Sequence, residues 1–169
     1  MAVDKLLKHN GTGGFAETVP VQVGGGGNAD RTAALDASGR FDVSMMPTGI
    51  GADTASIIAS EALAANDYVN VYNAAGVVKC RKADATVAGK EANGFVLAAV
   101  LNNANAIVYF EGTNAGVSGM LGGPVFLSTT PGQGTNTPPN ATGNVVQSIG
   151  YAVSATAVNF QSGAPITKV

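Results

Sequence analysis

The side chains best suited to acid–base, nucleophilic or metal chemistry are scarce in this sequence. His9 is its one histidine and Cys80 its one cysteine, and they stand far apart in the chain. A general base needs a fixed geometry and an orienting partner, whereas His9 is followed by Asn10 and Gly11 in a glycine-rich stretch. A zinc site needs several His, Cys or carboxylate ligands. We therefore expect no nucleophilic site and no metal, and we interpret Cys80 as a small strand residue.

Other polar patterns have the composition of known sites without their spacing. Glu61 and Asp67 could form an acid–base pair, yet any chain of this length contains such pairs. The run Gly24–Gly27 lacks the Lys-Ser/Thr of a phosphate-binding loop, so a spacer is the better interpretation. Three aspartates are spaced too irregularly for the calcium loop of an EF-hand: Asp36, Asp42 and Asp53. The sequence thus predicts neither an enzyme nor a cofactor.

The aromatic residues leave a binding function open. Carbohydrate sites use exposed aromatic rings flanked by Asn and Asp side chains. This chain has no Trp, and seven of its aromatic residues fall at expected strand positions: Tyr68, Tyr72, Tyr109, Phe110, Phe126, Tyr151 and Phe160. Packing within the core or between subunits is the simpler interpretation, and a glycan-binding surface is the alternative.

Charge and hydropathy argue against two classes of partner. The net charge is -2 and the basic residues are scattered, whereas a nucleic-acid binder needs a basic stripe. The longest apolar run, Phe95–Leu101, is far shorter than the roughly 20 residues of a membrane-spanning helix. Residues 1–8 contain no long apolar signal-peptide core. We expect no nucleic acid, membrane or small-molecule substrate as a partner, and synthesis in a cytoplasm without export by the general route.

Residues 1–52 are predicted to form an extended, Gly-rich N-terminal arm. The runs Gly11–Gly14 and Gly24–Gly27 make ordering of the backbone entropically costly. The arm also contains apolar islands that are too short to build a core alone: Leu6-Leu7, Val19–Val23, Phe41 and Met45-Met46. Such an arm gains stability only by docking on its own body or on neighbouring subunits.

Residues 53–169 are predicted to form a compact all-β body. Asp67–Tyr72 alternates with a two-residue period, and Asn73–Gly76 is a turn that leads into Val77–Arg81 as the return strand. Thr54–Ala65 fits either a short helix or a strand, and its adjacent isoleucines favour the strand. Further short strands at regular spacing are typical of a sandwich or barrel: Gly94–Val100, Ala106–Glu111, Pro124–Ser128, Val145–Ile149 and Ala157–Gln161.

The body also contains a loose internal repeat and a long stretch without charge. Residues 67–112 and 123–163 each read as an apolar strand, a loop and a hairpin that ends in an aromatic, a polar residue and Gly. We expect the two units to pair into one closed or nearly closed barrel, which protects sheet edges. Between Glu111 and Lys168 no residue is charged, although a solvated surface normally carries mixed charges. Burial by sister subunits explains this stretch, and a neutral polar surface is the alternative.

Several phrases resemble those of tailed-bacteriophage structural proteins, a group that includes capsid decoration (cement) proteins and head fibres. Arg31–Asp42 followed by Met45–Gly49 is similar to a segment that leads from an N-terminal arm into the body in that group. The resemblance continues through most of the chain in four later phrases: Gly94–Val100, Val108–Gly112, Val125–Gly132 and Pro138–Gln147. The chain lacks the longer repeats of a fibre, which favours the decoration role.

The resemblance implies a homotrimer with β-tulip or small-barrel bodies on the outer capsid surface of a virion, where its arms clamp subunits of the major capsid protein. The alternative is a tail- or fibre-associated module that binds host-surface glycans. In the decoration role, seven apolar side chains of the arm are expected to make the capsid or inter-subunit contacts: Leu6, Leu7, Phe15, Val21, Phe41, Met45 and Met46.

Overall fold

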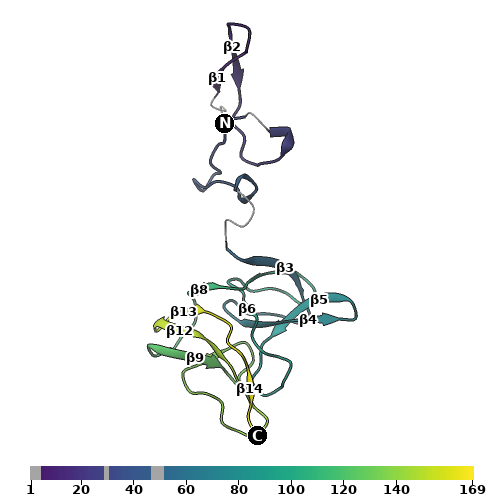
Figure 1. Cartoon of the computed structure of the whole chain (residues 1–169), viewed down its shortest axis with the longest axis vertical. Coiled ribbons are helices and arrows are strands. Elements are labelled where there is room, and N and C mark those ends of the chain that lie inside the picture. The colour runs from purple at the N-terminus through teal and green to yellow at the C-terminus, as the bar shows by residue number, and fades with distance from the viewer. Residues whose placement is uncertain (1–4, 29–30, 47–51) are drawn as a thin grey trace. The chain divides into compact units, whose positions relative to one another are not determined.

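The computed structural model describes residues 5–28, 31–46 and 52–169 (Figure 1). The chain separates into two units, Met1–Gly51 and Ala52–Val169, which are described in turn as the arm and the body. Residues 47–51, which include part of the Met45–Gly49 phrase, lie outside the described residues. Apart from two short 3-10 turns, every regular element described is a β-strand, so the predicted all-β class is confirmed.

The arm begins with a hairpin of β1 (Leu6–His9) and β2 (Phe15–Thr18), paired antiparallel from Leu6↔Thr18 to His9↔Phe15. Its loop explains one of the glycine runs. The side-chain oxygen of Asn10 accepts hydrogen bonds from the backbone N–H groups of Thr12 (3.0 Å) and Gly14 (2.9 Å). Gly11 has a φ of 78°, in the left-handed region that glycine adopts without strain. The run is therefore a specific turn in a stretch expected to be irregular.

The rest of the arm contains short, local contacts. Val21 forms a single parallel bridge with Ala33, and two 3-10 turns follow, η1 (Gly26–Asn28) and η2 (Val43–Met45). The Gly24 N–H donates to the Ser44 hydroxyl at 2.7 Å, and a Cβ at Gly24 would lie 2.1 Å from the Ser44 carbonyl oxygen. A side chain at position 24 would therefore separate these two segments.

The N-terminal half of the body closes into a five-stranded barrel, which confirms the predicted barrel. Its hydrogen-bonded order is β3 (Thr54–Ala59), β5 (Val77–Lys82), β4 (Tyr68–Ala74), β6 (Gly94–Phe95) and β7 (Asn105–Tyr109). The first strand closes the ring, because β3 pairs parallel with β5 and antiparallel with β7. The predicted hairpin at 67–81 corresponds to β4 and β5. The predicted strand Gly94–Val100 is wrong beyond Phe95, where the chain leaves the ladder.

The C-terminal half forms a separate five-stranded sheet. Its order is β10 (Gly134–Thr135), β9 (Gly123–Leu127), β12 (Ser148–Ser154), β13 (Ala157–Phe160) and β8 (Gly112–Asn114). Two further strands, β11 (Val145–Val146) and β14 (Ile166–Thr167), form a separate antiparallel pair. The expectation that both repeats share one barrel is therefore wrong. The first unit closes on itself because β3 supplies the missing pairing on both sides.

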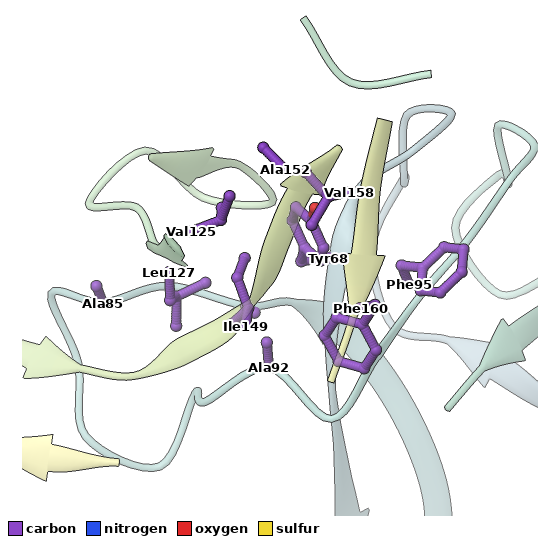
Figure 2. Packing of buried hydrophobic residues seen from close by; sticks show 11 residues of the cluster. Tyr68, Ala85, Ala92, Phe95, Val125, Leu127, Ile149, Ala152, Val158 and Phe160 are labelled. Carbon is purple, nitrogen blue, oxygen red and sulfur yellow. The ribbon is translucent and has the colours of Figure 1, made fainter. Parts of the chain in front are cut away.

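Two apolar cores hold the body together, and β4 belongs to both. Val69 lies in the core inside the barrel, whereas Tyr68, on the opposite face of the strand, packs in the core between barrel and sheet. Phe95 and Val96 divide between the two cores in the same way. Figure 2 shows part of the second core, with Tyr68 and Phe95 beside residues of the C-terminal sheet. The strand predicted to be half-buried is thus covered on both faces at its start.

A buried glutamine ties the barrel segment to the C-terminal sheet. Gln147 is 1% exposed, accepts a hydrogen bond from the Ala92 N–H (2.8 Å) and donates to the Ala92 carbonyl (2.9 Å). The Tyr68 hydroxyl is also buried, and it has no hydrogen-bond partner within normal geometry among the described residues. Burial raises the pKa of Tyr68 to about 12, with a smaller opposite effect from Asn114.

Candidate binding surfaces

The arm hairpin exposes large apolar side chains on both of its faces. Leu6 is 41% exposed, Leu7 72% and Phe15 73%. The register places Leu7, His9 and Phe15 on one face, where the His9 and Phe15 rings meet edge to face at 6.1 Å. A two-stranded hairpin alone is marginally stable in water. Within the arm, these apolar side chains therefore have little to pack against.

The remaining predicted contact residues divide into two groups. Phe41 and Met46 are exposed, at 53% and 45%. Val21 and Met45 are half-buried and line a small cavity of about 280 Å³ within the arm. Three further apolar side chains of the arm are exposed and were missing from the prediction, although they belong to the same kind of apolar island: Val19, Val23 and Leu35.

The titratable residues considered in the sequence take part in hydrogen bonds, ion pairs or core packing that support the fold. His9 accepts a hydrogen bond from the Gly11 N–H, which fixes the hairpin loop. Glu61 accepts from the Lys82 N–H at 2.8 Å, and Asp67 lies 3.3 Å from the Lys82 ammonium. Cys80 lies in the barrel core, and burial raises the pKa of its thiol. Each group has a partner or a packing role in the fold.

Asp36 and Asp42 of the arm also accept hydrogen bonds from nearby residues. Asp36 accepts from the N–H groups of Ser38 and Arg40, which closes a turn in the arm. Hydrogen bonds from Ser44 lower the pKa of Asp42. Within the described ranges, no group of three or more His, Cys, Asp or Glu side chains is placed to hold a metal ion.

A groove of the body lies on the outer face of the C-terminal sheet and has a volume of about 1190 Å³. A row of side chains crosses four strands there, because the register aligns Pro124 on β9, Tyr151 on β12, Asn159 on β13 and Thr113 on β8. Tyr151 is 56% exposed. The groove is also lined by residues that surround this row: Ala52, Phe110, Glu111, Gly112, Ser148, Gly150, Phe160, Gln161, Ser162 and Gly163.

A β-bulge turns Tyr151 into this groove. Ser148 pairs with Phe126 and Gly150 with Val125, so that two residues of β12 stand where β9 advances by one. Ile149 therefore points into the core while Tyr151 points outward. Gly150 has a φ of 134°, and a Cβ there would lie 2.0 Å from the Asn159 carbonyl oxygen. Only glycine fits this position.

A second, apolar groove of about 450 Å³ lies beside the barrel, between residues 96–101 and β7. Around it, Leu97 is 42% exposed, Ile107 49% and Leu101 78%. The predicted strand Gly94–Val100 ends at Phe95, and the chain beyond it forms one wall of this groove. The body thus has an apolar surface of its own.

Comparison with known proteins gave no match: no family model, no curated protein and no solved structure is significantly similar to the chain. Within the described parts of the chain, the structure contains no helix with the length and apolar character needed to cross a membrane.

Proposed function

We propose that this chain is a capsid decoration protein of a tailed bacteriophage, which binds the outer face of the shell and clamps neighbouring subunits of the major capsid protein through its arm. The observation that carries the proposal is the contrast in burial between the two units. Leu7 and Phe15 of the arm are 72% and 73% exposed, and neither of the two core clusters includes a described residue of the arm. The body also exposes apolar side chains, such as Leu101 at 78%, but it has these two cores. Such an arm has apolar surface to contribute to a partner.

The proposed mechanism is thermodynamic. Burying one large apolar side chain contributes about 1.5–3 kcal/mol. A protein that binds only the assembled shell stabilises it by mass action, and repeated contacts raise the avidity. No bond is made or broken, so the role needs no catalytic residue. This agrees with the structural surroundings of His9, Cys80 and the carboxylates.

Self-association, as the homotrimer that the sequence resemblance implies, is part of the proposal. Two features support it: the apolar groove around Leu97, Leu101 and Ile107, and the absence of charge from residue 112 to residue 167. Association of uncharged surfaces has a small desolvation cost, because no charged group has to be removed from water. Light scattering on the purified chain is expected to give three chain masses. A monomer at all concentrations would remove the trimer from the proposal.

The arm is tested by deletion and by a double substitution. Removing residues 1–46, or changing Leu7→Ser with Phe15→Ser, is expected to abolish cosedimentation with capsids assembled without this protein. The matched control is Val77→Ser with Val78→Ser, two body residues that are 47% and 53% exposed. The control is expected to bind normally. Normal binding by the deletion variant would contradict the proposed role of the arm.

A further inference from the structure

We infer that the groove on the outer face of the C-terminal sheet binds a neutral carbohydrate, with Tyr151 as the platform for a sugar ring. This goes beyond the proposed capsid role and does not depend on it, because every residue that lines the groove belongs to the body. At about 1190 Å³, the groove exceeds the roughly 300–1,000 Å³ of typical small-molecule pockets. It has room for an oligosaccharide segment.

The apolar part of the site is the pair formed by Tyr151 and Pro124. Tyr151 is 56% exposed and lies directly opposite Pro124 in the β12–β9 register. A tyrosine offers a large, rigid apolar face and a polar hydroxyl at its edge. A pyranose ring has the complementary pattern, with C–H groups on its faces and hydroxyl groups around its rim. Tyr151 and Pro124 together form a flat apolar strip on which such a ring can stack.

The polar part of the site begins with a positioned amide. The Thr113 hydroxyl donates to the Asn159 side-chain oxygen at 2.8 Å, and this bond fixes the orientation of the Asn159 amide. The Asn159 NH₂ donates no hydrogen bond to the described residues, so both of its donors are available beside Tyr151. A sugar hydroxyl can accept from this NH₂ and donate to a neighbouring oxygen at the same time.

Three more polar side chains lie around this row. Within the described part of the chain, the side chains of Ser148, Gln161 and Glu111 line the groove without a hydrogen bond to the protein. They provide a hydroxyl, an amide and a carboxylate, which together offer both donors and acceptors. Sugar hydroxyls need this mixture, since each one is itself a donor and an acceptor.

The charge of the groove selects a neutral ligand over an anionic one. Glu111 is the single charged side chain among the residues that line it. Phosphate and carboxylate groups are bound in proteins mainly by Arg and Lys, and none is present in the lining. Glu111 would also repel an anion. An uncharged glycan fits the chemistry of this surface better than a nucleotide, an acidic peptide or an anionic polysaccharide.

The test is a titration of the full-length protein, followed by NMR of its backbone amides. The probes are the neutral trisaccharides maltotriose, cellotriose, mannotriose and N,N′,N″-triacetylchitotriose, with the galacturonic acid trimer as an anionic counterpart. We expect at least one neutral probe to shift the amide signals of β12 and β13 around Tyr151 and Asn159. The anionic trimer is expected to leave them unchanged. No shift in this groove with any neutral probe at millimolar concentration would overturn the inference.

Variants separate ring stacking from general effects on the fold. Tyr151→Ala is expected to weaken binding about tenfold or more, whereas Tyr151→Phe keeps the ring and should stay within about twofold of the parent. Tyr72→Ala is the matched control, because Tyr72 lies on the barrel hairpin, where Arg81 covers its ring. Its affinity is expected to be unchanged. Equal binding by Tyr151→Ala and the parent would contradict the role of Tyr151, and the amide shifts of the parent protein decide the site even if a variant misfolds.

Discussion

Two phenylalanines show how differently the arm and the body use the same residue type. Phe15 on the arm hairpin is 73% exposed and has one aromatic neighbour, His9. Phe95 in the body is 1% exposed, and its ring lies 5.4 Å from that of Tyr109 and 5.6 Å from that of Phe160. The body buries Phe95 together with Tyr68 and Phe160, whereas the arm presents Phe15 to solvent. The apolar surface of the arm therefore contributes little to the stability of the isolated chain and is available for association.

The largest expected effect is the difference in stability between truncating Phe95 and truncating Phe15. Phe95→Ala should destabilise the body by about 3–5 kcal/mol, because it leaves a cavity at the contact between barrel and sheet. Phe15→Ala should change the stability of the body by less than about 0.5 kcal/mol, as is usual for exposed side chains. Urea unfolding followed by circular dichroism measures both. A comparable loss from Phe15→Ala would mean that the arm hairpin is part of the folded core.

The second comparison concerns two amides that both bridge backbone groups. Gln147→Ala should cost about 2–3 kcal/mol, because the buried N–H and C=O groups of Ala92 lose their partner. Asn10→Ala removes the acceptor of the arm loop, where water can replace it, and should leave the unfolding midpoint of the body unchanged. Chemical denaturation of both variants tests the pair. Equal stability of Gln147→Ala and the parent would show that water reaches Ala92.

The third effect appears only at alkaline pH. Tyr68 has an ordinary pKa of 10.0 that burial raises to about 12 in the folded protein. Between these values the unfolded chain releases the phenolic proton while the folded chain keeps it, so stability falls as pH rises. The full loss is about 2–3 kcal/mol above pH 12.

Tyr68→Phe provides the control for this pH dependence. It should remove most of the loss between pH 10 and 12 at little cost near neutrality, since the Tyr68 hydroxyl has no hydrogen bond to lose. The raised pKa of Cys80 acts in the same direction from pH 9 upward and remains in the variant. Unfolding midpoints measured from pH 8 to 12 would contradict the assignment if parent and variant declined in parallel.

Local patterns predicted the strands of the body better than their arrangement. The alternation in Asp67–Tyr72 and the turn at Asn73–Gly76 are local, so they were enough to predict the β4–β5 hairpin. Closure of the barrel depends on β3 meeting β7, and neither strand carries a signal for a partner so distant in sequence. The apolar run from Gly94 was predicted to be one strand. The strand ends at Phe95, and the Val96 N–H donates to the Asp67 carbonyl oxygen, just before the start of β4.

The groove was harder to predict than the strands. A strict two-residue period places Ile149 and Tyr151 on the same face of β12, which would bury both. The bulge at Ile149 and Gly150 places them on opposite faces. The glycine between two apolar residues was the available signal, since a glycine within a strand often marks a bulge. The row from Pro124 to Thr113 also depends on the pairing register of four strands, which the sequence does not specify.

The position of β3 in the barrel has a consequence for the order of events during synthesis. Its two hydrogen-bonding neighbours, β5 and β7, are both translated after it, and β7 ends only at Tyr109. At roughly 5–20 residues per second, a nascent chain therefore waits on the order of seconds before β3 has both partners. Thr54–Ala59 has two free edges until β5 is made and one free edge until β7 is made, and a free strand edge can pair with other chains. Ribosome-bound chains that stop before β7 therefore carry an unpaired strand edge.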